Sequence, residues 1–142
     1  MKISKYLSEV IMFFLFVISV VSLNIPAFYV SDPVGESSRM TIKSFQILQY
    51  SPFGLIACLI PFLLIALYYS ALPRNTKTIL LFVIAILSGF CFNHAYLETF
   101  NGLHINCQCF VKIKPGVILT PAIMFVSFVW FFLCFNKFKY KM

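Results

Sequence analysis

Long stretches without charge alternate with short polar segments along the whole chain. Charged residues are absent from residues 10–31 and 44–73, and two further apolar stretches follow. Each stretch holds the roughly 20 apolar residues that a helix needs to cross a bilayer core about 30 Å thick. The pattern predicts four transmembrane helices, at about residues 10–30, 52–72, 78–97 and 116–136. We therefore expect residues 1–142 to form one all-α integral membrane domain, an antiparallel up-down bundle of four helices.

Composition supports a membrane protein. Of the 142 residues, 61% are hydrophobic and 11% are charged, and the mean hydropathy is +0.95. Soluble domains are about 45–50% apolar and about 25% charged. The net charge of +7 suggests nucleic acid at first sight, but the basic residues stand in small groups beside the apolar stretches. That distribution is typical of topology signals and lipid headgroup contacts, so the expected partner is the lipid bilayer and not nucleic acid.

The first apolar stretch has two readings. It is apolar on all sides, as a lipid-embedded helix should be, and Asn24 and Pro26 are expected to mark where the regular helix ends on the far side. A basic start and the small residue Ser22 also fit a cleaved signal peptide. Glu9 before the stretch and continued apolarity up to Val30 favour a retained span. Both readings leave the next segment on the same side of the membrane.

Prolines and an amphipathic segment mark the second span. Pro52 is well placed as a first-turn proline, so the helix is expected to begin there. Pro61, inside the span, is expected to kink it. Residues 45–50, just before the span, have an amphipathic pattern and are expected to lie along the membrane surface.

Basic residues are divided unequally between the two sides of the membrane. The amino end, the turn between the second and third spans, and the carboxyl end together hold seven Lys and Arg, against four in the two other loops. Positively charged segments stay preferentially in the cytoplasm. Both termini are therefore expected to be cytoplasmic, with residues 31–51 and 98–115 forming outer loops.

Five cysteines are present, and two of them, Cys107 and Cys109, fall in the second outer loop. In an oxidising compartment these two could form a disulfide, although only one residue separates them and the bridge would be strained. Free thiols are the alternative. The odd total leaves at least one thiol free in either case.

Histidines near the same loop raise the question of a metal site. Such a site would gather His94, Glu98 and His104 with Cys107 and Cys109. The sequence contains neither a CxxC nor an HxxxH motif, so no metal is predicted. His94 and Glu98 are four residues apart and are instead expected to form a polar pair on one helix face near the outer boundary.

Two classes of membrane protein, an enzyme and a transporter, match this sequence poorly. A quinone-linked thiol oxidoreductase of the four-helix kind needs cysteine pairs in both outer loops, and the first outer loop has no cysteine. A small multidrug exporter needs a carboxylate deep in the first helix, whereas Glu9 lies at its edge. We therefore predict no enzyme activity, no catalytic residue and no cofactor.

Short motifs in the second half of the chain resemble a known family. Arg74-Asn75-Thr76 opens the third span, and Leu97-Glu98-Thr99 with Gly102 closes it. Together with four spans and cytoplasmic ends, these motifs resemble the immunity proteins of pore-forming colicins. The resemblance implies a bacterial inner-membrane protein that contacts the toxin's helices as they insert, before a channel opens. The candidate specificity residues in the outer loops are Arg39, Lys43, Glu98, His104 and Lys112.

Other functions fit the same architecture. The main alternative is a small accessory subunit whose helices pack against a larger membrane protein. A thiol- or metal-active protein is a further alternative, which would depend on Cys107 or Cys109.

Overall fold

The computed structural model describes residues 4–31, 39–106 and 110–136, and four long helices make up most of the chain. Each of the four is long and apolar enough to cross a membrane. The chain is therefore a multi-pass integral membrane protein, as its hydrophobic pattern predicts. The four helices are α1 (Lys5–Ser22), α3 (Pro52–Tyr69), α4 (Arg74–Asn106) and α5 (Gly116–Asn136).

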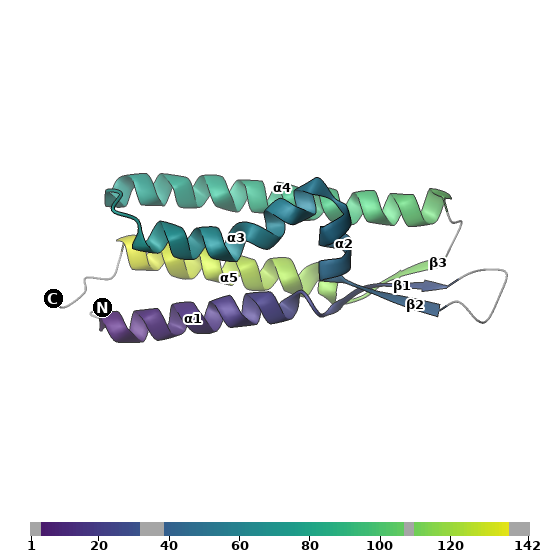
Figure 1. Ribbon diagram of the computed structural model, residues 1–142, viewed down its shortest axis with the longest axis horizontal. Coiled ribbons are helices and arrows are strands. Elements are labelled where there is room, and N and C mark those ends of the chain that lie inside the picture. The colour runs from purple at the N-terminus through teal and green to yellow at the C-terminus, as the bar shows by residue number, and fades with distance from the viewer. Residues whose placement is uncertain (1–3, 32–38, 107–109, 137–142) are drawn as a thin grey trace.

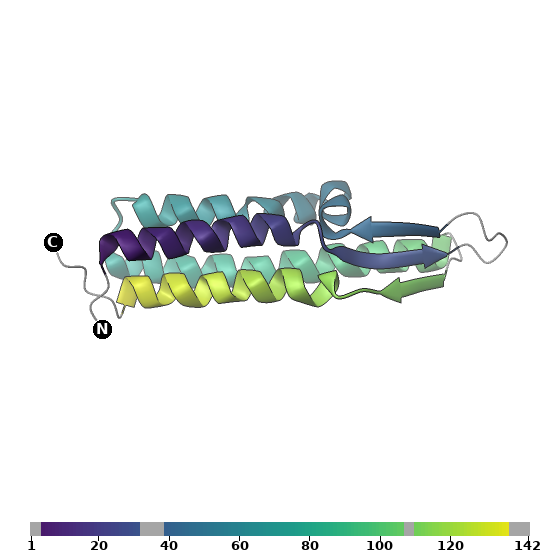
Figure 2. The same ribbon diagram turned by 90° about the horizontal axis from the view of Figure 1, so that it is seen from below.

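The long helices lie side by side in one bundle, and successive helices run in alternate directions (Figure 1). The closest helix pairs are α3 with α4, α1 with α5, and α4 with α5. α1 begins, α5 ends and α3 connects to α4 at the same end of the bundle, which we call the terminal end. Three strands lie at the opposite end, which we call the strand end (Figures 1 and 2).

α1 is shorter than the predicted first span. Ser4 caps its start, because the Ser4 Oγ accepts a hydrogen bond from the Leu7 N–H at 3.2 Å. The helix ends at Ser22, and strand β1 (Pro26–Ser31) follows. The prediction of one helix over residues 10–30 is therefore wrong beyond Ser22. Residues 27–30 are apolar because they belong to a sheet that packs on the bundle, not because they face lipid.

β1 is the central strand of a three-stranded antiparallel sheet. β2 (Arg39–Lys43) pairs with one of its edges and β3 (Phe110–Ile113) with the other. The all-α class is wrong in this respect, because both predicted outer loops contribute a strand. The helical part of the class is confirmed. Strands of four to six residues beside much longer apolar helices leave little periodic signal in the sequence.

One face of the sheet packs on α4. Side chains alternate between the two faces of a strand, and Phe28 and Val30 of β1 are buried. The Phe28 ring lies 6.3 Å from the ring of Tyr96 and 6.1 Å from the ring of Phe100, both on α4. These aromatic contacts join the sheet to the bundle.

α4 extends well beyond the predicted third span of residues 78–97. Its 33 residues make a helix about 50 Å long, against a bilayer core of about 30 Å. Glu98, Asn101 and Gly102, which we read as the end of the span, lie inside this helix. Polar residues end the membrane-embedded part of a helix without ending the helix itself. The additional turns of α4 support the sheet.

The predicted outer loop at residues 31–51 contains a second element, helix α2 (Ser44–Tyr50). Ile47 and Leu48 of this helix are buried, so one face of the helix packs on the protein. α3 begins at Pro52 as predicted, but it ends at Tyr69 and not near residue 72. Gly54 permits the tight turn from α2 into α3, since a Cβ there would overlap the backbone of Leu48.

The last helix and the segment before it differ in how well the sequence predicts them. α5 covers residues 116–136, as predicted. The predicted outer loop at residues 98–115 is wrong as a loop, because it holds the end of α4 and strand β3.

A cluster of buried hydroxyl groups joins four elements where the strand end meets the bundle. The Tyr96 hydroxyl donates a hydrogen bond to the Ser44 Oγ at 3.2 Å, and the Ser44 Oγ donates to the Ile25 carbonyl at 3.3 Å. The Thr120 Oγ1 donates to the Ser22 carbonyl at 3.0 Å and lies 3.4 Å from the Ser44 Oγ. The cluster satisfies these buried polar groups and ties α1, α2, α4 and α5 together.

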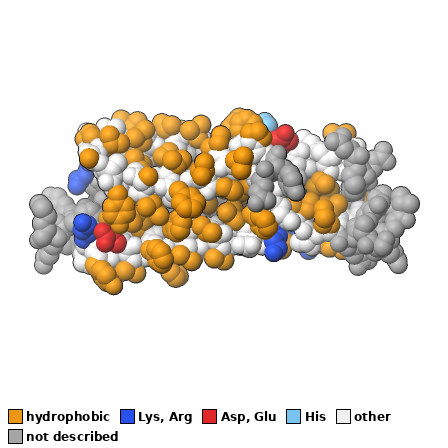
Figure 3. Space-filling model, viewed as in Figure 1, with side chains coloured by type: hydrophobic (Ala, Val, Ile, Leu, Met, Phe, Trp, Pro, Cys, Tyr) orange, Lys and Arg blue, Asp and Glu red, His pale blue; other side chains and the backbone are white. Residues whose placement is uncertain are grey.

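The surface of the helices is apolar. Large hydrophobic side chains such as Phe13, Phe62, Ile86 and Phe125 are more than half exposed. Figure 3 shows this surface on one face, with hydrophobic side chains over the helices and charged side chains near the two ends of the apolar zone. Such a surface is stable only where lipid covers it, which agrees with membrane insertion.

Candidate functional site

The sheet has a second face, turned away from α4, that carries polar and basic side chains. Tyr29 of β1 lies between Thr41 of β2 and Lys112 of β3, which are its partners in the register. Lys114, two residues further on, places its Nζ 5.5 Å from the centre of the Tyr29 ring. This distance is within the range of a cation–π contact. We call Tyr29, Thr41, Lys112 and Lys114 the basic sheet face.

The sheet also has two open edges. In the order β2-β1-β3, both β2 and β3 are edge strands within the described sheet. Edge strands present backbone N–H and C=O groups that a further strand can pair with. Phe110, at the start of β3, leaves 70% of its surface exposed. An exposed aromatic ring beside cations and an open strand edge suits recognition of a protein surface that is acidic or polar.

Three of the five candidate residues from the sequence lie on the strands. Lys112 is exposed on β3 as part of the basic sheet face. Arg39 begins β2 opposite Ser31 and is separated from Lys112 by the width of β1. Lys43 ends β2 opposite Pro26, and its backbone N–H donates to the Gln46 Oε1 at 2.9 Å. The sheet therefore holds Arg39 and Lys43 on one edge strand and Lys112, distant in the sequence, on the other.

Glu98 lies on α4, away from the sheet face. Its carboxylate is 3.7 Å from the His94 Nδ1, which confirms the predicted polar pair on one helix face. The Glu98 carboxylate also accepts a hydrogen bond from the Ser51 Oγ at 3.3 Å, and the His94 ring packs against Phe53 with a centroid distance of 4.4 Å. These contacts join α4 to the start of α3, so Glu98 and His94 stabilise the packing of these helices.

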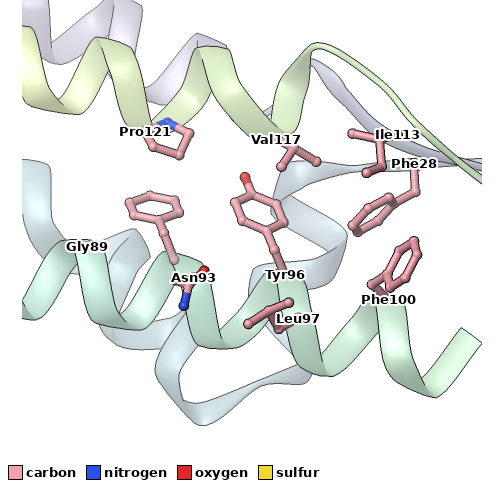
Figure 4. Close-up of a pocket in the computed structure, with 10 residues that line it drawn as sticks. Phe28, Gly89, Asn93, Tyr96, Leu97, Phe100, Ile113, Val117 and Pro121 are labelled. Carbon is pink, nitrogen blue, oxygen red and sulfur yellow. The ribbon is translucent and has the colours of Figure 1, made fainter.

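His104 lies in the last turn of α4. Its ring is stacked on Phe100 at 6.0 Å, and Phe100 in turn contacts Phe28. Phe28 and Phe100 line a groove of about 400 Å³ between α4, α5 and the sheet, shown in Figure 4 with Val117 and Pro121 on the opposite wall. The groove is mostly apolar, and the structure places neither Glu98 nor His104 among its lining residues.

Within residues 4–31, 39–106 and 110–136, no three His, Cys, Asp or Glu side chains are grouped as metal ligands would be. Cys107 and Cys109, and with them the predicted disulfide, lie outside the described residues. His94 and His104 are ten residues apart on one helix and make separate contacts.

Sequence reasoning missed Tyr29, Phe110 and Lys114. The signal was present in residues 110–114, where Phe110, Lys112 and Lys114 alternate with apolar residues in the period-2 pattern of a strand. The sequence pattern predicts an outer loop at residues 98–115, since this segment is short and lies between two long apolar stretches. Tyr29 falls within the predicted first span of residues 10–30, and nothing in that apolar run predicts a strand.

Comparison of the chain with protein-family models, curated proteins and solved structures finds no match.

Proposed function

We propose that the chain is a membrane-embedded binding protein that protects a bacterial cell against a pore-forming toxin. The basic sheet face is the observation that carries this proposal. It is built from three separate strands that lie at one end of the helix bundle (Figure 1), where a protein approaching the membrane would meet it. Helices α3 to α5 would then contact the toxin's hydrophobic segments within the bilayer.

The proposal requires the strand end to face outward. In the sequence, the amino-terminal residues, the turn between α3 and α4 and the carboxyl-terminal residues hold seven of the eleven Lys and Arg, which favours the cytoplasm for the terminal end. The strand end would then face the periplasm of a bacterial inner membrane. This orientation also suits an encounter with a toxin that arrives from outside.

Labelling of single cysteines tests the orientation. In a chain whose five cysteines are replaced by serine, Thr41→Cys at the strand end should react with a membrane-impermeant maleimide in intact cells. Asn75→Cys, an exposed residue at the terminal end, is the matched control and should react only after permeabilisation. The reverse pattern would place the sheet in the cytoplasm and contradict the proposal.

Potassium leakage tests the protective function. Cells that express the chain should retain potassium when challenged with one member of a panel of pore-forming toxins, and should leak with the others. Lys112→Glu should lower the tolerated dose roughly tenfold, because losing one interfacial charge contact costs about 1.4 kcal/mol or more. The control Asn101→Glu adds a negative charge on α4, on the other side of the sheet, and should change the dose by less than about twofold.

Membrane levels of both variants are measured in the same cells. Equal protection by both variants would show that the basic sheet face is not part of the toxin-binding site. Equal leakage with and without the chain, across the whole panel, would reject immunity altogether.

A second function is favoured by a different observation. A wholly apolar groove of about 240 Å³ runs along the membrane-embedded surface between α4 and α5, lined by Phe82, Phe125 and Phe132 among others. A transmembrane helix of a larger protein would fit such a groove. A stoichiometric partner retained in mild detergent, together with no protection against toxins, would favour an accessory subunit over immunity.

A further inference from the structure

A basic pocket lies at the terminal end of the bundle, far from the sheet. Its volume is about 460 Å³, and all four long helices or their connections contribute to its walls. Lys5 comes from the start of α1, and Arg74 and Lys77 come from the start of α4. Tyr68 and Tyr69 end α3, and α5 contributes Phe135 near its own end.

Lys77 is held in place within this pocket. Its Nζ donates a hydrogen bond to the Tyr68 carbonyl at 2.7 Å and lies 5.8 Å from the centre of the Phe135 ring. An ammonium group has three donors, so two of them remain for a ligand. The bond to Tyr68 fixes the position of the cation before any ligand arrives, which reduces the entropy lost on binding.

The pocket carries a net positive charge. Three cations line it, against one nearby carboxylate, Glu9 on α1, which acts electrostatically on the lining residue Tyr69. Among the described residues, the only ion pair is the one between His94 and Glu98 at the other end of α4. Arg74 is exposed, and its guanidinium offers five donors in a planar fork that suits a phosphate.

The pocket lies at the level of lipid headgroups. α3 has 18 residues and is about 27 Å long, which nearly matches a bilayer core of about 30 Å. Since α3 ends at Tyr69, the pocket falls at the boundary of the core. Tyrosine side chains are typical of this boundary, and basic pockets between transmembrane helices bind lipid headgroups there.

We infer that this basic pocket binds the phosphate of an anionic phospholipid headgroup. Arg74, Lys77 and Lys5 contact the phosphate oxygens, and Leu72 and Phe135 contact the first methylenes of the acyl chains. The site goes beyond the proposed immunity function and does not depend on it. It would anchor the terminal end of the bundle in membranes that contain acidic lipids.

Native mass spectrometry of the full chain, released from detergent micelles, tests this site. Micelles are supplemented with phosphatidylglycerol or with phosphatidylcholine of the same acyl chains, and in a third arm with inorganic phosphate at constant ionic strength. We expect one phosphatidylglycerol retained per chain, at least about fivefold in excess over phosphatidylcholine. Inorganic phosphate should not displace it at equal concentration, because it lacks the acyl-chain contacts.

Variants assign the binding to the pocket. Arg74→Gln and Lys5→Gln remove exposed cations, and each should lower phosphatidylglycerol retention about fivefold. Lys43→Gln, an exposed cation at the strand end, is the matched control and should leave retention unchanged. Equal retention of the two lipids, or equal retention by Arg74→Gln and Lys43→Gln, would overturn the site. Displacement by inorganic phosphate at equal concentration would assign the pocket to free phosphate and overturn the lipid assignment.

Discussion

Gly116→Ala should destabilise the protein by up to about 3 kcal/mol, because the added methyl group has no space. A Cβ at Gly116 would overlap the carbonyl oxygen of Pro26 and would come within 2.8 Å of the carbonyl oxygen of Ile25. Both neighbours are backbone atoms of the segment that leads into β1, so no side chain can rotate away. The start of α5 would have to move off the strand. Thermal unfolding in detergent should show a markedly lower midpoint.

The same substitution at Gly89 is the matched control. Gly89 also lies in a long helix, but nothing lies within 4 Å of the position that its Cβ would occupy. Alanine favours helix over glycine by about 1 kcal/mol, so Gly89→Ala should leave the unfolding midpoint unchanged or raise it. If the two variants unfolded alike, close contact between α5 and β1 would not be what requires glycine at Gly116.

Phe28→Ala should loosen the packing of the sheet on α4. Phe28 is 2% exposed and lies on the central strand against Tyr96 and Phe100. Removing a buried phenyl ring costs about 3–5 kcal/mol, through lost burial and the cavity that remains. The four long helices do not depend on this contact and should stay inserted. Hydrogen exchange of the backbone amides should therefore accelerate strongly in β1 and much less in α3 or α5.

Phe110→Ala removes the same ring from a site that is 70% exposed, at the start of β3. Exposed substitutions of this kind usually change stability by less than about 0.5 kcal/mol, so the exchange rates in β1 should be almost unaffected. Equal acceleration in both variants would show that the sheet is held by its backbone pairing and not by the Phe28 contacts with α4.

The sequence predicts the membrane-embedded part of this fold better than the part outside it. Burial in lipid requires about 20 consecutive apolar residues, and that requirement leaves a long signal, as in α5. The strands contain six residues or fewer, and their apolar positions resemble the end of a span or a loop. Residues 27–30 show the problem, since the same apolar run suits a lipid-facing helix and a buried strand.

Some contacts of the candidate residues could be predicted from the sequence, and others could not. The pairing of His94 with Glu98 could be predicted because it depends only on helical spacing. The contact between Lys114 and Tyr29 could not, because it depends on the register of two strands that are distant in the sequence. The basic pocket was also missed, since its three cations meet only when the starts of α1 and α4 lie at the same end of the bundle.

The place of β1 at the centre of the sheet has a consequence for biosynthesis. β1 can pair with β2 soon after the two leave the ribosome, but its other edge waits for β3, which immediately precedes the last membrane helix. Until β3 is synthesised, β1 presents an open strand edge. A chain that stops before β3 therefore leaves its central strand half paired, whereas both edges of β1 are paired once β3 is in place.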